Sequence, residues 1–233
     1  MSEYIATVKA NSGREYRLQS LSDKDIIFSI YNGIHKFYEY QVLEEIKRMD
    51  LAGIYLDIGA NIGNHGVFFA GECFSEKVIC IEPCRDFRRF ISLNFFDNKL
   101  EDKLQLHACA LLDRLTALSL SETNLDNIGV KHITNFDSGD VFGTTLDALL
   151  PDLDNVVVMK IDTEGCECKV IAGGQEFFKR NSPVLISEAN TVEELKEFAE
   201  CVVPLGYKPH GGNWMESDIP TSGWAPTYMW VRG

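Results

Sequence analysis

Acidic side chains lie at the ends of four short apolar runs in this chain. Asp57 lies inside the run at 54–58, and Glu82, Asp162 and Glu188 follow three later runs. A single acid near a helix N-terminus is explained by the helix dipole, which is worth about 0.3 to 1 kcal/mol. Four acids at one edge of a sheet would repel one another, so they favour a shared crevice that binds a positively charged ligand.

The turn after the first of these runs, residues 57–66, reads D-I-G-A-N-I-G-N-H-G. Its glycines let the backbone turn tightly and approach a ligand, and the helix that follows offers free N–H groups. The dinucleotide fingerprint G-x-G-x-x-G is not met, because Asn61 stands where the middle glycine is needed. A pyrophosphate would also gain nothing from the nearby carboxylate of Asp57.

From residue 54 onward, expected strands alternate with expected helices, and these elements must position the acidic residues. Short apolar runs and amphipathic stretches in turn predict a parallel sheet covered on both faces, with ligands bound at the carboxyl ends of its strands. Strands are expected at 54–58, 78–81, 104–110, 156–161 and 184–186, and helices at 65–74, 85–96, 167–179 and 193–201. Thr191 and Glu194 form a capping box for the last helix.

The remaining segments predict a cap, an arm and a tail. A hairpin of 4–8 with 15–18 and helices at 23–31 and 37–49 are expected to form an N-terminal cap, residues 1–50, on a main domain of 51–233. Residues 115–143, rich in Asn, Thr, Ser and Asp, are expected to hold one or two short strands as an arm. Strand-like ends flank a loop in the tail, 206–233.

Four motifs in order resemble one family. D-I-G-A-N-I-G at 57–63, I-E-P at 81–83, T-L-D at 145–147 and K-I-D-T-E-G at 160–165 with Glu167 are similar to the FkbM-type methyltransferases, which belong to the class that uses S-adenosylmethionine. The resemblance runs from about Phe37 to Glu188. It implies a Rossmann-like α/β fold: a seven-stranded, doubly wound, mostly parallel sheet closed by an antiparallel C-terminal hairpin of 207–208 and 228–231. It also implies methyl transfer, usually to a hydroxyl of a sugar, polyketide or similar small molecule.

Cofactor contacts are expected mainly in the first two turns. The sulfonium and ammonium of S-adenosylmethionine are both positive and therefore complementary to a rim of carboxylates. Asp57 is expected to set the first turn and to reach the ammonium directly or through water, and Glu82 to accept hydrogen bonds from the ribose hydroxyls. The resemblance places adenine near the third strand end. The further cofactor-binding residues expected are Gly59, Ala60, Asn61, Gly63, His65, Pro83, Cys109, Ala110 and Asp162.

Transfer to a hydroxyl also needs a general base, because a neutral hydroxyl is a poor nucleophile. Asp162 and Glu164, beside the expected methyl position, are the candidates for base and acceptor binding, although they could instead cap the next helix. Lys160 can face the same side, and Glu188 can orient the acceptor. Among the histidines, His65 and His210 are weak candidates for the base. Trp214 and Trp224 in the tail could line an acceptor pocket or simply pack under the loop.

Grouped carboxylates can also bind Mg²⁺ or Ca²⁺, but no spacing here is diagnostic, and no metal site is predicted. Two alternatives to the methyltransferase stay open: a nicotinamide-dependent oxidoreductase on a similar sheet, and a module that binds the cofactor without catalysis.

The amino-acid composition argues against several classes of binding partner. The chain has 233 residues, with 22 Lys and Arg against 35 Asp and Glu, a net charge of −13 that disfavours nucleic acid. We find no signal peptide and no apolar run near the roughly 18 residues of a membrane span, so a cytoplasmic protein is expected, with no membrane partner. Among seven cysteines, Cys73, Cys80, Cys109 and Cys201 lie in apolar runs and are expected to be reduced core thiols, and no zinc spacing is present.

Overall fold

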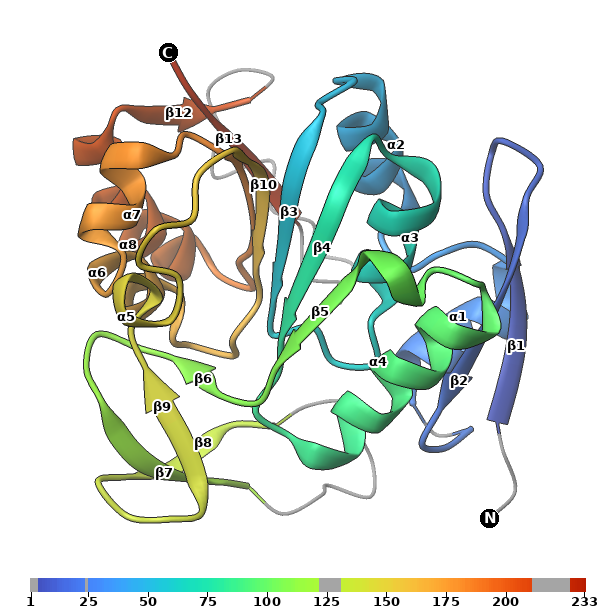
Figure 1. Ribbon diagram of the computed structural model, residues 1–233, viewed down its shortest axis with the longest axis horizontal. Coiled ribbons are helices and arrows are strands. Elements are labelled where there is room, and N and C mark those ends of the chain that lie inside the picture. Colours follow the sequence, from blue (N-terminus) through green and yellow to red (C-terminus); the bar gives the residue numbers. More distant parts are fainter. Residues whose placement is uncertain (1–3, 24, 122–130, 211–226) are drawn as a thin grey trace.

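The computed structural model describes residues 4–23, 25–121, 131–210 and 227–233. Its main feature is a seven-stranded sheet in the order β12-β13-β11-β10-β3-β4-β5 (Figure 1). The strands β5, β4, β3, β10 and β11 run parallel, and β13 and β12 form the antiparallel edge. The bounds are β3 (Gly53–Ile58), β4 (Ser75–Ile81), β5 (Leu104–His107), β10 (Val156–Ile161), β11 (Val184–Glu188), β12 (Tyr207–Pro209) and β13 (Thr227–Arg232). The expected seven-stranded fold, including its closing hairpin, is confirmed.

Side-chain alternation along the strands explains why both faces are covered. Tyr55 and Val78 belong to one core, whereas Leu56 and Ile79 belong to the other, because successive residues of a strand point to opposite faces. Helices α2 (Tyr40–Arg48), α3 (Asn64–Glu72) and α4 (Arg85–Asp97) cover the first face (Figure 1). The second is covered by α5 (Leu146–Leu149), α6 (Glu167–Ala172), α7 (Gln175–Arg180) and α8 (Val192–Val202). Short 3-10 turns lie at Glu101–Lys103 and Val203–Leu205.

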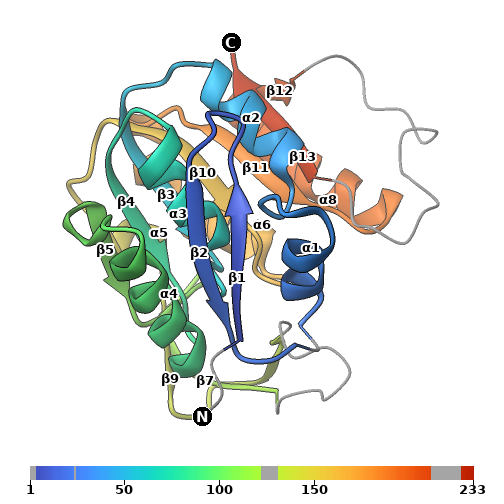
Figure 2. The ribbon, with the colours of Figure 1, turned by 90° about the vertical axis from the view of Figure 1, so that its right-hand side faces the viewer.

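The N-terminal segment packs against the first helical layer. The hairpin of β1 (Tyr4–Lys9) and β2 (Glu15–Ser20) is confirmed and lies beside α3 and α4, next to α1 (Ile26–Ile34) (Figure 2). Buried Tyr16 donates a hydrogen bond of 2.6 Å to Glu72 of α3, so hairpin and sheet share one core. The helix expected at 37–49 begins only at Tyr40, because Glu39 has a left-handed backbone with φ 56°. The boundary at residue 50 stays a prediction.

The arm forms a second sheet at the carboxyl ends of the main strands. It has four strands in the order β6-β9-β7-β8, and more of them than expected: β6 (Ala110–Leu111), β7 (Thr116–Leu120), β8 (Ile133–Phe136) and β9 (Val141–Thr144). The strand expected at 104–110 is confirmed for 104–107, which form β5. Its last three residues were predicted wrongly, since the chain leaves β4 after His107 and β6 pairs with β9 instead.

Two other expectations are corrected by packing. The helix expected at 167–179 breaks between α6 and α7 at Gly173, where a Cβ would lie 2.1 Å from the Leu112 carbonyl oxygen. Cys201 is not a reduced thiol: it forms a disulfide with Cys168 that joins α8 to α6, with 5.9 Å between the Cα atoms. The pairing depends on how the two helices pack, which cysteine spacing does not reveal. The other five cysteines are buried and unpaired.

Thr191 caps α8 as expected, accepting a hydrogen bond of 3.1 Å from the Glu194 amide. None of the helices in the described part of the chain is both long and apolar enough to cross a membrane.

Candidate active site

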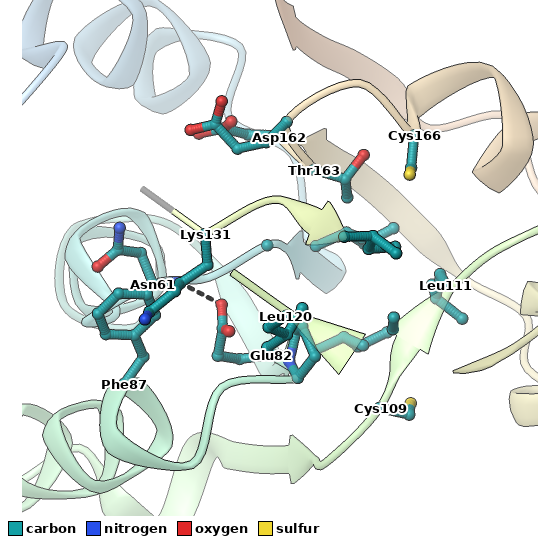
Figure 3. Close-up of a pocket in the computed structure, with 17 residues that line it drawn as sticks. Asn61, Glu82, Phe87, Cys109, Leu111, Leu120, Lys131, Asp162, Thr163 and Cys166 are labelled. Atoms are coloured by element: carbon teal, nitrogen blue, oxygen red, sulfur yellow. Dashed lines mark hydrogen bonds between the residues drawn. The ribbon is translucent and has the colours of Figure 1, made fainter. Parts of the chain in front are cut away.

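A pocket opens at the carboxyl ends of β3, β4 and β10, with the arm as one wall (Figure 3). Its empty volume is about 640 Å³, part of which is open to solvent. Asp162 and Glu82 lie on opposite sides of it, and Phe87, Leu111 and Leu120 supply apolar surface (Figure 3). The full lining is Ile58, Gly59, Asn61, Ile81, Glu82, Pro83, Phe87, Cys109, Ala110, Leu111, Leu120, Lys131, Ile133, Asp162, Thr163, Glu164 and Cys166.

The turn after β3 holds its shape through backbone contacts. The Gly59 and Ala60 amides both donate to the Ile81 carbonyl, at 2.9 and 3.3 Å. Gly59 has φ 72°, and a Cβ there would lie 1.7 Å from the Asp162 carbonyl oxygen. Only glycine therefore fits, because the turn passes directly against the residue that follows β10.

Glu82 forms a fixed carboxylate at one end of the pocket. Its side chain accepts hydrogen bonds from the amides of Asn61, at 2.9 Å, and Cys84, at 2.7 Å (Figure 3 shows the first). The residue is 5% exposed, and burial raises the pKa of Glu82 to about 7 despite these bonds. Each carboxylate oxygen accepts one amide bond and keeps a further lone pair. The carboxylate can therefore accept hydrogen bonds from two neighbouring hydroxyls, which fits a ribose.

A buried charge network lies beneath the turn. The Lys160 ammonium is 2.9 Å from Asp162 Oδ2, 3.8 Å from Asp57 Oδ1 and 3.4 Å from the Gly59 carbonyl oxygen. Burial alone would lower the pKa of Lys160, but Asp162, Asp57 and Glu39 together raise it above the ordinary value. Lys160 is thus a fixed cation that holds the two strand-end carboxylates.

Asp57 has no exposed surface, and its other oxygen accepts a 2.9 Å bond from the Gly66 amide. The expectation that Asp57 reaches the ammonium by direct contact is therefore wrong. Its part is to fix the turn and the start of α3, because the β3 residue that faces α3 is sealed by that helix.

The acids after β10 and β11 line a second cavity that adjoins the first at Asp162 and Glu164. Burial, with Asp162 and Glu39, raises the pKa of Glu188, and burial with Asp162 raises that of Glu164. Neither Asp162 nor Glu164 caps α6, which has no side-chain cap. Glu167 instead fixes the loop before this helix, accepting hydrogen bonds from the Thr163 amide at 2.8 Å and from the Gly165 amide at 3.1 Å. Other residues along this cavity are His132, Cys168, Asn190, Glu194, Glu197 and Phe198.

Besides Asp57, three residues expected to bind the cofactor do not line the pocket: Ala60, Gly63 and His65. Ala60 and Gly63 shape the turn, with φ 86° at Gly63 where α3 begins. His65 turns away, because its Nε2 lies 2.8 Å from Glu39 Oε2 and its Nδ1 3.3 Å from Asn64 Nδ2. The assignment of His65 to the cofactor site is therefore corrected to a contact with the N-terminal cap.

The tail contributes little to the described site. His210 lies 3.4 Å from Glu45 Oε1 and lines neither cavity. Trp214 and Trp224 lie outside the described residues.

The sequence did not single out Phe87 of α4 or the arm residues Leu120, Lys131 and Ile133, all of which line the pocket. The arm residues have no motif, since they reach the pocket only because the arm folds back under β4. Within the described residues, no group of three or more His, Cys, Asp or Glu has the geometry to hold a metal.

Comparisons with known proteins agree with this geometry. The chain resembles methyltransferase FkbM from Methylobacillus flagellatus (TM-score 0.55, 17% identity), covering 78% of this chain and 44% of that one. It also resembles an S-adenosylmethionine-dependent O-methyltransferase from Thermotoga maritima (TM-score 0.54, 11% identity), covering 97% of this chain and 77% of that one. A third similar structure is precorrin-6y C5,15-methyltransferase from Geobacter metallireducens (TM-score 0.52, 14% identity), with 82% of this chain and 86% of that one covered. At these identities the likeness concerns the fold.

No curated protein matches the sequence significantly. The family model of the methyltransferase FkbM domain, however, matches residues 57–202, which is more than half of the chain and includes the turn after β3, Glu82 and the acids after β10 and β11. The chain therefore belongs to the FkbM family of S-adenosylmethionine-dependent methyltransferases.

Proposed function

We propose that this protein transfers the methyl group of S-adenosylmethionine to a hydroxyl oxygen of a small acceptor. The observation that carries the proposal is the pairing of a ribose-type carboxylate, Glu82, with a group of acids, Asp162, Glu164 and Glu188, across one continuous crevice. The sugar and polyketide acceptors expected from the sequence remain the first to test.

The residues present fit this cofactor. Glu82 would hold the ribose, the apolar surface around Phe87, Cys109 and Leu111 would hold the adenine, and the narrow turn at Gly59 would admit the methionine part. When bound, the cofactor supplies an electrophilic methyl group on a positive sulfur. The protein's own task is to orient the acceptor oxygen in line with it and to remove a proton.

Among the acids, Glu188 is the best general base. The Asp162 carboxylate is already engaged in an ion pair with Lys160 at 2.9 Å. Burial and the neighbouring carboxylates make Glu188 more basic than an ordinary glutamate. A base works best when its pKa lies near the working pH. Asp162 and Glu164 would then bind the acceptor.

The test is a transfer assay with isotopically methyl-labelled S-adenosylmethionine and a panel of sugars, hydroxylated polyketides, phenols and amines. We expect label in a hydroxyl compound together with release of S-adenosylhomocysteine. Label in amines alone would refute O-methylation. Binding of NAD in place of S-adenosylhomocysteine, measured by thermal shift, would instead support the oxidoreductase.

The base is tested with Glu188→Gln, using Glu193→Gln in the exposed first turn of α8 as the matched control. Loss of a general base lowers turnover by about 10²- to 10⁴-fold. S-adenosylhomocysteine should bind the Glu188→Gln variant as it binds the wild type. Turnover within twofold of the wild type would remove Glu188 from this role.

A further inference from the structure

Glu39, the last residue before α2, carries a carboxylate of the N-terminal cap. Together with Thr227 it lines a third cavity, formed mainly by residues 29–42. One carboxylate oxygen lies 2.8 Å from His65 Nε2, and the other accepts a hydrogen bond from the Thr227 hydroxyl. His65 is in the first turn of α3, which follows β3, and Thr227 begins β13 as the register partner of Glu188 in β11. Glu39 therefore bridges elements on either side of one strand.

That strand is β10, because the sheet order places it between β3 and β11. A group held between the start of α3 and the end of β11 must lie near the carboxyl end of β10, where Asp162 follows. The charge of Glu39 indeed acts on both Lys160 and Glu188, which flank this end. The Glu39 carboxylate thus lies beside the Asp162 end of the crevice and away from Glu82, although it lines neither of the two cavities.

The position of Glu39 is accompanied by backbone strain. Its φ of 56° and ψ of 33° are left-handed, and the side chain gives no capping bond to α2. A non-glycine residue in this region costs about 1 kcal/mol or more and persists where the surroundings fix it. The side chain of Glu39 is only 11% exposed, so a charge has been buried in strained backbone at this point.

Charge complementarity indicates what Glu39 would meet. A ligand whose ribose is held at Glu82 extends over the turn after β3 toward the end of β10, so its amino-acid end arrives there. Asp57 is sealed and cannot contact an ammonium, and Asp162 already binds Lys160 at 2.9 Å. Beyond the contacts with His65 and Thr227, each oxygen of the Glu39 carboxylate keeps a lone pair.

We propose that Glu39 binds the ammonium of the cofactor's amino-acid portion, so that the N-terminal cap completes the cofactor site. His65 and Thr227 are positioning residues that fix the carboxylate. The inference rests on the proposed use of S-adenosylmethionine and adds a residue that lies outside the turn after β3 and outside the span of the family match.

The test compares two probes that differ in the group concerned. S-adenosylhomocysteine carries the ammonium, whereas 5′-methylthioadenosine keeps the adenosine and sulfur and lacks the amino-acid portion. Calorimetric dissociation constants are measured for the wild type, Glu39→Gln, Thr227→Val and the control Glu45→Gln. Glu45 lies in α2, the helix that follows Glu39, and pairs with Arg48 and His210.

We expect Glu39→Gln to weaken S-adenosylhomocysteine about 10-fold or more, as for loss of a hydrogen bond to a charged group, and to leave 5′-methylthioadenosine within about twofold. Thr227→Val, which keeps the charge, should weaken S-adenosylhomocysteine less than Glu39→Gln does. Glu45→Gln should change neither constant.

Equal weakening of both probes would mean that Glu39 only docks the cap, and unchanged binding of both would mean that it faces elsewhere; either result overturns the inference. If wild-type protein binds 5′-methylthioadenosine and S-adenosylhomocysteine equally well, the ammonium has no partner, and the inference fails while the cofactor assignment stands. If it binds neither, the cofactor assignment itself fails.

Discussion

Glu82 offers the sharpest test of the cofactor site, because ionisation of its buried carboxyl group should have two opposite effects. It should lower the stability of the folded protein and raise the affinity for the cofactor's ribose. The change is Glu82→Gln, which keeps the shape and one acceptor oxygen but removes the charge. The Gln carbonyl can accept from only one of the two amides that now bond the carboxylate, Asn61 and Cys84. It also leaves at most one acceptor for two ribose hydroxyls.

The expected loss of affinity follows from the hydrogen bonds. A bond to a charged group is worth about 1.5 to 3 kcal/mol, so the dissociation constant of S-adenosylhomocysteine should rise by about 10- to 150-fold. In the wild type the pKa of about 7 means that the carboxylate forms as pH rises from 6 to 8, so affinity should increase over this range. The Gln variant should lack that increase.

Stability should respond with the opposite sign. The folded pKa of Glu82, about 7, lies above the ordinary value of 4.5, so the folded state binds more protons between these pH values than the unfolded state. Its contribution to the free energy of unfolding therefore falls as pH rises from 4.5 to 7, by about 3 kcal/mol at 1.4 kcal/mol per pH unit. Glu82→Gln should remove this slope.

The measurements are calorimetric binding at pH 6, 7 and 8 and urea unfolding across pH 4.5 to 8. The matched control is Glu101→Gln, at an exposed residue at the opposite end of the sheet. A Gln variant that binds S-adenosylhomocysteine as tightly as the wild type, with the same pH dependence, would refute the ribose role of Glu82.

Three further changes test the framework around the site. Gly59→Ala should abolish S-adenosylhomocysteine binding and lower the melting temperature, because the new methyl would lie 1.7 Å from the Asp162 carbonyl oxygen; unaltered binding would show that this turn can move freely. Lys160→Met should destabilise the protein by about 3 to 5 kcal/mol in urea unfolding, since it leaves a fully buried carboxylate unpaired, and a loss below 1 kcal/mol would contradict the network. Removing the bond between Cys168 and Cys201 with dithiothreitol should cost about 2 to 4 kcal/mol, checked by melting with and without reductant; equal melting temperatures would contradict a stabilising disulfide.

The sequence by itself determined the sheet and the residues that follow its strands. Runs such as 54–58 and 156–161 are apolar on both faces, and a helix must cover each face, so alternation alone predicts strand ends that share one edge. Glu82 and Asp162 were predicted as pocket residues for this reason, and both line it. The capping box at Thr191 is equally local, because its two partners are three residues apart.

Tertiary structure alone decided which of these residues are open to a ligand. Asp57 is the penultimate residue of β3 and Glu82 follows β4, and the sequence marks both as strand-end acids. Only the tertiary structure shows that α3 seals Asp57 and that the pocket opens on Glu82. The disulfide between α6 and α8, the arm wall and the hydrogen bond from Thr227 of β13 to Glu39 depend on contacts between segments far apart in the chain. Such contacts leave no periodic signal, because burial and pairing there are set by the packing of whole elements and not by the spacing of neighbouring residues.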